Sequence, residues 1–139
     1  MRLFVYGTLA PGHDAWAVLE PWVVGESRAD AVTGRLYDTG RGYPAATFDP
    51  APDPDPDPER AGRVVHGTVV TLDPARTTAA LHALDRYEGH EYERIAVRTQ
   101  AGLDVATYAW TAPLTGCRRL GEGRWRDRPQ DETPGPDGR

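Results

Sequence analysis

RLFVYGTL, at residues 2–9, is the segment from which the architecture of this chain can be inferred. Residues 2–6 favour β-structure, and the run stops abruptly at Gly7. This pattern predicts a first strand that leads directly into a loop. Gly7 and Gly12 resemble the glycines of a phosphate-binding loop, but His13 and Asp14 stand where that loop has lysine and a hydroxyl residue. The loop is therefore either an amide-lined site for an anion or oxyanion, or an ordinary strand-to-helix turn.

The remainder of the chain predicts mostly strands. Extended segments are expected at residues 22–27, 31–37, 43–48 and 63–72, and a hairpin at 91–99 and 103–111. A short helix capped by Asp14 is expected at 14–20, and a longer one begins at Asp73-Pro74 and ends near Glu88, before Gly89. Because strands outnumber helices, the predicted class is α+β, with a mainly antiparallel sheet or barrel and one main helix.

Two segments carry no regular pattern. Residues 49–59 read DPAPDPDPDPE, where prolines remove amide donors and carboxylates repel one another. An extended, solvated loop is expected there. A calcium site is disfavoured because the prolines hold the carboxylates apart. Residues 124–139 are charged and rich in proline and glycine, and we expect them to be partly disordered, with Trp125 as a possible anchor.

Composition restricts the function. The 139 residues suit a single core, and the net charge of −5 without a basic stripe argues against nucleic-acid binding. A single cysteine excludes an internal disulfide and favours a reducing compartment. The first apolar run is too short for a signal peptide, and no later segment has the length of a membrane span. We expect a cytoplasmic protein, with a monomer as the default.

The longer helix places a carboxylate at its end. Leu81, Leu84 and Glu88 are spaced by three and four residues, so they share one helix face. This spacing carries Glu88 towards the interior, where lost hydration and the negative helix end both raise its pKa. A carboxyl whose pKa approaches neutrality can act as a general acid and base. The alternative is a solvated glutamate at a frayed helix end.

Other reactive side chains form no recognisable constellation. Cys117 lies beside two arginines, but no histidine and asparagine pattern supports a thiol nucleophile. Ser27 lies in no nucleophile-elbow motif. The histidines lack zinc-ligand spacing, and His66 is expected to face the core or the barrel. We therefore expect no metal site.

Several segments, taken in order, resemble the γ-glutamylcyclotransferase-like (AIG2-like) family over residues 2 to about 112. The matching segments are FVYGTL at 4–9, GRLYD at 34–38, YPA at 43–45, GTV at 67–69, LDRYEG at 84–89, YER at 92–94 and ATYAW at 106–110. The resemblance implies a barrel-like α+β domain that encloses a polar cavity. It also implies a domain at residues 1–112, with a loop insert at 49–60, followed by a C-terminal extension at 113–139.

The resemblance also implies a chemistry. Glu88 would be catalytic, and Tyr6, Gly7, Thr8 and Leu9 would bind substrate through backbone groups, with Tyr108 as a further pocket residue. The reaction would be cyclisation of a γ-glutamyl amide or amine to 5-oxoproline, with no cofactor or metal. Glutathione-derived peptides, γ-glutamyl-amino acids, γ-glutamyl-ε-lysine and acylated biosynthetic amines all stay open as substrates. A non-catalytic module that binds a small molecule and an amide hydrolase are the alternatives.

Overall fold

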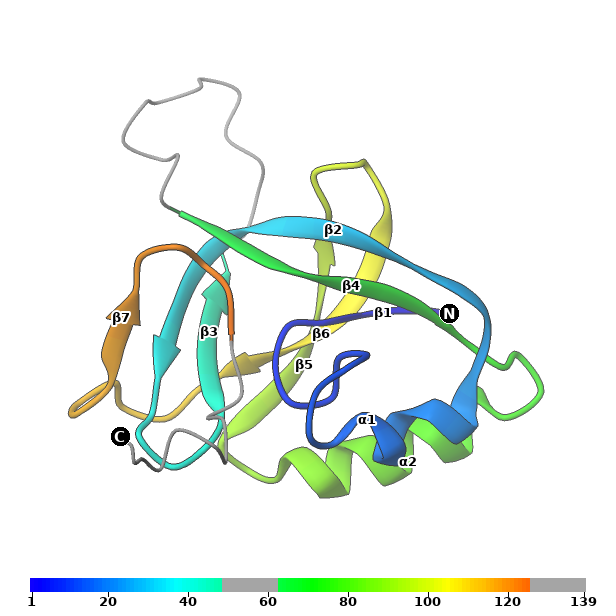
Figure 1. Ribbon diagram of the computed structural model, residues 1–139. Helices are drawn as coiled ribbons and strands as arrows, with labels where there is room; N and C mark the ends of the chain where they lie inside the picture. The colour runs from blue at the N-terminus through cyan, green and yellow to red at the C-terminus, as the bar shows by residue number, and fades with distance from the viewer. Residues whose placement is uncertain (49–62, 126–139) are drawn as a thin grey trace, which may run out of the picture.

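In the computed structural model, which describes residues 1–48 and 63–125, seven strands form one sheet and helices pack on one side of it (Figure 1). The elements, in chain order, are β1 (Arg2–Val5), α1 (Trp16–Leu19), the 3₁₀ segment η1 (Glu20–Trp22), β2 (Val23–Asp38), β3 (Pro44–Phe48), β4 (Val64–Leu72), α2 (Thr77–Glu88), β5 (Tyr92–Arg98), β6 (Asp104–Trp110) and β7 (Arg118–Leu120).

The strands follow the order β3-β2-β4-β1-β6-β5, and β7 pairs with the end of β2. Every pair is antiparallel except β1 with β6, which is parallel. The hydroxyl of Tyr92 in β5 donates to the carbonyl of Pro44 in β3 at 2.5 Å, so a hydrogen bond joins the two ends of the order. The sheet is therefore a nearly closed barrel, which confirms the predicted α+β class.

Strand β1 is buried on both faces and divides the core. Leu3 and Val5 point into a cluster that contains buried side chains of α1 and α2. Phe4 and Tyr6, on the opposite face, belong to a second cluster with side chains of β2, β3 and β4. Strand β1 therefore lies between the two clusters, and the loop that follows β1 begins between them.

The first strands differ from the prediction in one respect. The segments 22–27 and 31–37, expected as two strands, form the single strand β2, except that Trp22 ends η1 and β2 begins at Val23. A register shift against β4 occurs between Val24 and Arg28, and Gly25 has a φ of 71°. The irregularity accommodates the positive φ of Gly25 without ending the strand, so the two predicted segments are continuous.

Both helices start later than predicted. Asp14 is not the cap of α1, because Ala15 precedes the helix and its amide donates to the carbonyl of Thr8 at 2.8 Å. Asp73 is not the cap of α2 either, because its carboxylate accepts from the amide of Ala75 at 3.0 Å and so closes a turn before the helix. The predicted end of α2 is confirmed, since Gly89 follows Glu88 with a φ of 80°.

The chain after β6 packs on the same sheet. Besides the β7 pairing, Trp125 is 8% exposed within the second cluster, and the amide of His66 donates to the carbonyl of Gly123 at 2.8 Å. The domain boundary at residue 112 stays a prediction. The predicted loop at 49–60 and the tail beyond residue 125 lie outside the described residues. No helix in the described part has the length and apolar character needed to cross a bilayer.

Candidate active site

A pocket of about 340 Å³ lies where the loop after β1 meets the end of α2. Its volume falls in the range of small-molecule sites. The lining residues are Phe4, Val5, Tyr6, Gly7, Thr8, Leu9, Tyr43, Pro44, Tyr87, Glu88, Glu91, Tyr92 and Tyr108. All the residues that the sequence predicts for the site are therefore brought together at one place, although they come from three distant parts of the chain. Their roles stay predictions.

The loop after β1 has little room for side chains. A Cβ on Gly7 would lie 2.6 Å from Cγ of Pro44, so the start of β3 approaches the loop too closely for any residue but glycine. The carbonyl of Gly7 accepts from Ala10 and that of Thr8 from Ala15, which fixes the loop. Among the described residues, no group accepts from the amides of Thr8 and Leu9. Both amides belong to residues that line the pocket.

Glu88, the last residue of α2, is half-buried and lines the pocket. Within the described residues, its carboxylate makes no hydrogen bond and no ion pair. Burial raises the pKa of Glu88 from 4.5 to about 7. The carboxyl therefore has comparable populations with and without its proton near neutral pH, which is the condition for proton transfer in both directions.

Two tyrosines next to Glu88 stay protonated. Burial raises the pKa of Tyr6, and the charges of Tyr92 and Glu88 raise it further. Burial likewise raises the pKa of Tyr92, with Glu88 as the next cause. Their hydroxyls are already used, because Tyr6 donates to the carbonyl of Tyr108 at 2.5 Å and Tyr92 to that of Pro44. The two tyrosine rings therefore form part of the pocket wall and limit the access of water to the carboxyl of Glu88.

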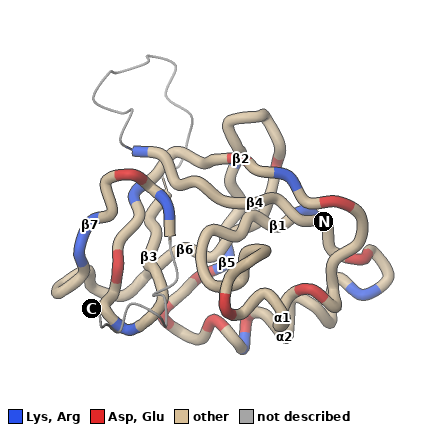
Figure 2. Tube along the Cα trace, in the orientation of Figure 1, with Lys and Arg blue, Asp and Glu red and all other residues tan. Residues whose placement is uncertain are grey.

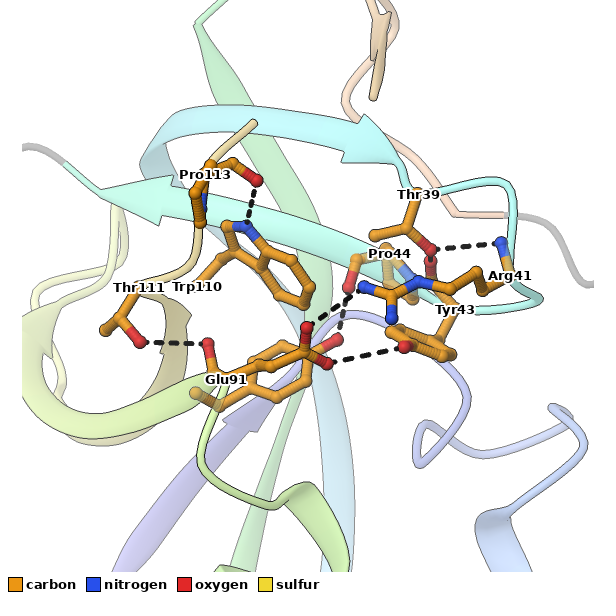
Figure 3. Close-up of polar contacts among 9 residues, drawn as sticks. Thr39, Arg41, Tyr43, Pro44, Glu91, Trp110, Thr111 and Pro113 are labelled. Carbon is orange, nitrogen blue, oxygen red and sulfur yellow. Dashed lines mark hydrogen bonds and ion pairs between the residues drawn. The ribbon is translucent and has the colours of Figure 1, made fainter. Parts of the chain in front are cut away.

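The polar mouth of the pocket was not predicted as a site from the sequence. Glu91 lines the pocket and accepts from Nη2 of Arg41 at 3.1 Å, with the hydroxyl of Tyr43 3.5 Å from its other oxygen (Figure 3). The guanidinium of Arg41 lies over Tyr43, 5.2 Å from the ring centroid, and over Trp110, 5.7 Å from it. Figure 3 shows these side chains converging from β3, β6 and the segments that precede β3 and β5. Tyr43, Tyr87 and Tyr92 lie in segments that carry the family resemblance but were assigned no role, whereas no sequence signal indicated Glu91.

Other candidates considered from the sequence lie elsewhere. Neither Cys117, Ser27 nor any histidine lines the pocket. His66 is in β4 beside Gly123, is partly exposed and belongs to neither core cluster, and burial lowers its pKa. In the described ranges, no three His, Cys, Asp or Glu side chains come together as a metal site would require.

The pocket wall contains two carboxylates and no arginine among its lining residues. In the view of Figure 2, acidic and basic residues are interspersed along the described chain. Arg41, whose guanidinium lies over the ring of the lining residue Tyr43, pairs with Glu91.

Comparison with known proteins shows to which family the sequence is similar. The sequence profile of the family described as "Gamma-glutamyl cyclotransferase, AIG2-like" matches residues 3–127. A search of the curated proteins found no significant match.

Several solved structures have a similar fold. The Escherichia coli protein ytfP is 30% identical, with a TM-score of 0.53 over 90% of this chain and 96% of that one. An aig2-like protein of Mus musculus is 18% identical, with a TM-score of 0.64 over 94% and 97% of the two chains. The uncharacterised protein PH0828 of Pyrococcus horikoshii is 20% identical, with a TM-score of 0.62 over 89% and 88%.

Proposed function

The chain belongs to the AIG2-like gamma-glutamyl cyclotransferase family, and on that premise we propose that it cleaves a γ-glutamyl amide to 5-oxoproline and a free amine, with Glu88 as general base and acid. Members of this family are enzymes in general. The pocket volume suits a γ-glutamyl group together with part of the amine that leaves.

The reaction needs a proton acceptor that later becomes a donor. Ionised Glu88 takes a proton from the substrate's α-ammonium group, and the freed amine attacks the γ-carbonyl carbon to close a five-membered ring. Protonated Glu88 then gives a proton to the departing nitrogen as its bond to the γ-carbon breaks, and the ring nitrogen releases its second proton, which the free amine takes up. The carboxylate is regenerated, and the substrate supplies both nucleophile and electrophile. Because the attack is intramolecular, the enzyme's contribution is chiefly orientation and proton transfer.

The observation that carries the proposal is the unpaired carboxyl of Glu88, with a pKa raised to about 7, in the same pocket as two unused amides. A solvated glutamate at a frayed helix end would have neither a raised pKa nor a place in a pocket with such amides. The Thr8 and Leu9 amides would hold the substrate carboxylate or the oxyanion that forms on the γ-carbonyl.

A panel of γ-glutamyl amides and amines, analysed by mass spectrometry, tests this function. Wild type is expected to release 5-oxoproline from at least one substrate. Glu88→Gln keeps the side-chain size but cannot accept the proton, and it should lower the rate roughly 10²- to 10⁴-fold. Glu93→Gln is the matched control, because Glu93 is an exposed residue of β5 that does not line the pocket.

Three other results would each exclude the proposed cyclotransferase activity or the role of Glu88 in it. Release of glutamate in place of 5-oxoproline would identify an amide hydrolase, with water as the nucleophile. A ligand that binds and is recovered unchanged would identify a binding module. Equal turnover by wild type and Glu88→Gln would remove Glu88 from the mechanism.

A further inference from the structure

Glu88 has no polar contact of its own within the described residues, so its position depends on the helix that carries it. The last turn of α2 is attached to the sheet by Asp85, which lies three residues before Glu88 and therefore next to it on the helix surface. What holds Asp85 also sets where the Glu88 carboxyl lies.

Asp85 accepts hydrogen bonds from two strands. Nη1 of Arg94, in β5, lies 3.0 Å from Oδ1 and 2.9 Å from Oδ2 of Asp85. The hydroxyl of Tyr108, in β6, donates to Oδ1 at 2.6 Å. We call Asp85, Arg94 and Tyr108 the helix clamp. It joins α2 to the hairpin formed by β5 and β6.

The tyrosine is the stronger half of the clamp. Arg94 and Asp85 are 34% and 45% exposed at their side chains, and an ion pair so open to water stabilises little by itself. The residue Tyr108 is 5% exposed, and a short hydrogen bond from a buried hydroxyl to a carboxylate is charge-assisted. Tyr108 therefore provides a rigid contact, while Arg94 helps to orient the carboxylate of Asp85.

Tyr108 also holds the other side of the pocket. Its carbonyl accepts from the hydroxyl of Tyr6, the residue that links β1 to the amide-bearing loop. A continuous path of hydrogen bonds thus runs from the loop through Tyr6, Tyr108 and Asp85 to the turn that carries Glu88. This path connects the two parts of the pocket that carry the loop amides and the Glu88 carboxyl.

We propose that Asp85 is a positioning residue, which acts through Tyr108 and Arg94 to hold Glu88 at a fixed distance from the loop amides. The inference rests on the proposed function, because it describes how the same site is assembled. A displacement of about 1 Å in such a site can reduce the rate roughly 10²-fold, so the clamp governs turnover more than substrate affinity.

Asp85→Ala and Asp85→Asn separate position from charge. Both remove the carboxylate charge, but the amide oxygen of asparagine can still accept from Tyr108. Asp85→Ala is expected to lower kcat at least about tenfold with KM changed less than about twofold, and Asp85→Asn to recover most of that loss. Tyr108→Phe combined with Asp85→Ala should cost no more than the larger single effect, since both break one contact.

The matched control is Asp104→Ala. Asp104 pairs with Arg98 at 3.2 Å on the same hairpin, and both side chains are well exposed. This variant should leave kcat and KM unchanged. Equal kcat in wild type and Asp85→Ala, or a loss in Asp85→Asn as large as in Asp85→Ala, would overturn the inference.

A second measurement keeps this test independent of the reaction. The pKa of Glu88 can be followed by NMR of its labelled carboxyl carbon. The titratable or charged groups around it include Tyr6, Glu91, Tyr92 and Tyr108 in the pocket wall and Asp85 and Arg94 in the clamp. Asp85→Ala should let water reach Glu88 and lower its pKa by more than about one unit, whereas Asp85→Asn should lower it by less than about half a unit. If wild type forms no 5-oxoproline, the proposed function fails while this comparison still decides the clamp. Equal pKa values in all three proteins, or equal falls in both variants, would refute it.

Discussion

At neutral pH, Glu88 imposes a cost on folding because nothing among the described residues compensates its charge. Burial raises its pKa from 4.5 to about 7, so the folded protein binds this proton more tightly than the unfolded chain does. The stability gained from that proton is complete below pH 4.5 and is lost as pH rises through about 7. The group that suits the proposed chemistry is therefore a source of instability under the conditions in which it would work.

Replacing Glu88 by glutamine tests this cost directly. Below pH 4.5 the protonated glutamate and glutamine should be equivalent, so wild type and Glu88→Gln should unfold at the same urea concentration. At pH 8 the variant should be more stable by up to about 3 kcal/mol, at about 1.4 kcal/mol for each pKa unit. Urea denaturation of both proteins between pH 4 and 8 provides the measurement. A stability difference that does not change with pH would show that Glu88 is solvated.

The pH dependence of turnover follows from the same ionisation. If Glu88 is the general base, kcat/KM should fall about tenfold for each pH unit below 7 and become level above it. The rate of 5-oxoproline release between pH 5 and 9 gives this profile. An acidic limb centred near 4.5 would mean that the group responsible is an ordinary solvated carboxyl.

Single residues of the site could be predicted to different degrees. Glu88 follows from local sequence, because the spacing from Leu84 places it on the inward face of a helix. Tyr108 could be identified only through the family resemblance. Glu91 gave no signal, since it has neither an apolar pattern nor a motif position that distinguishes it from a solvated residue. Tyr87 belongs to the LDRYEG segment of the resemblance, but no role was assigned to it. Both residues line the pocket.

The end of α2 depends on a backbone conformation that only glycine adopts easily. Gly89 has φ 80° and ψ −172°, and its amide donates to the carbonyl of Asp85. Residues other than glycine in this region cost about 1–3 kcal/mol. Because Gly89 directly follows Glu88, relaxation of this strain would also displace the carboxyl.

Gly89→Ala should therefore lower both stability and turnover. The control is Gly102→Ala in the β5–β6 turn, where φ is 88° and an added Cβ also meets nothing within 4 Å. Both variants should unfold at lower urea concentration than wild type, but only Gly89→Ala should slow 5-oxoproline release per folded molecule. Equal activity of the two variants would mean that the helix end does not set the position of Glu88.

Element boundaries show where local patterns are sufficient. The β5–β6 hairpin and the glycine stop of α2 were predicted because neighbouring residues determine both. The sequence did not predict that β2 is one continuous strand. Its pairing with β4 maintains the strand on both sides of Gly25, and β4 lies about 40 residues away along the chain. The start of α2 was missed because Asp73 closes a turn, which its sequence cannot distinguish from a helix cap.

At the level of the whole molecule, alternation predicts strands but not their neighbours. The parallel pairing of β1 with β6 joins Leu3 to Ala106, and the closure of the barrel depends on Tyr92 and Pro44. In both contacts the two residues lie far apart in the sequence, so no local pattern predicts that they meet. The predicted class could therefore be derived from the residues, whereas the enclosed cavity was expected only from the family resemblance.

The predicted domain end at residue 112 is the largest-scale expectation that can be tested. Trp125 fills part of the core beside Phe4 and Tyr6, and β7 continues the pairing of β2. A chain that ends at residue 112 would lose these contacts, and Trp125→Ala alone should cost about 3–5 kcal/mol. That is a large share of a typical stability of about 5–15 kcal/mol. Urea denaturation should show both variants unfolding well below the wild-type midpoint, the shortened chain at the lower concentration. If both kept the wild-type midpoint, residues 113–139 would be an appendage, and the core around the pocket would be complete without them.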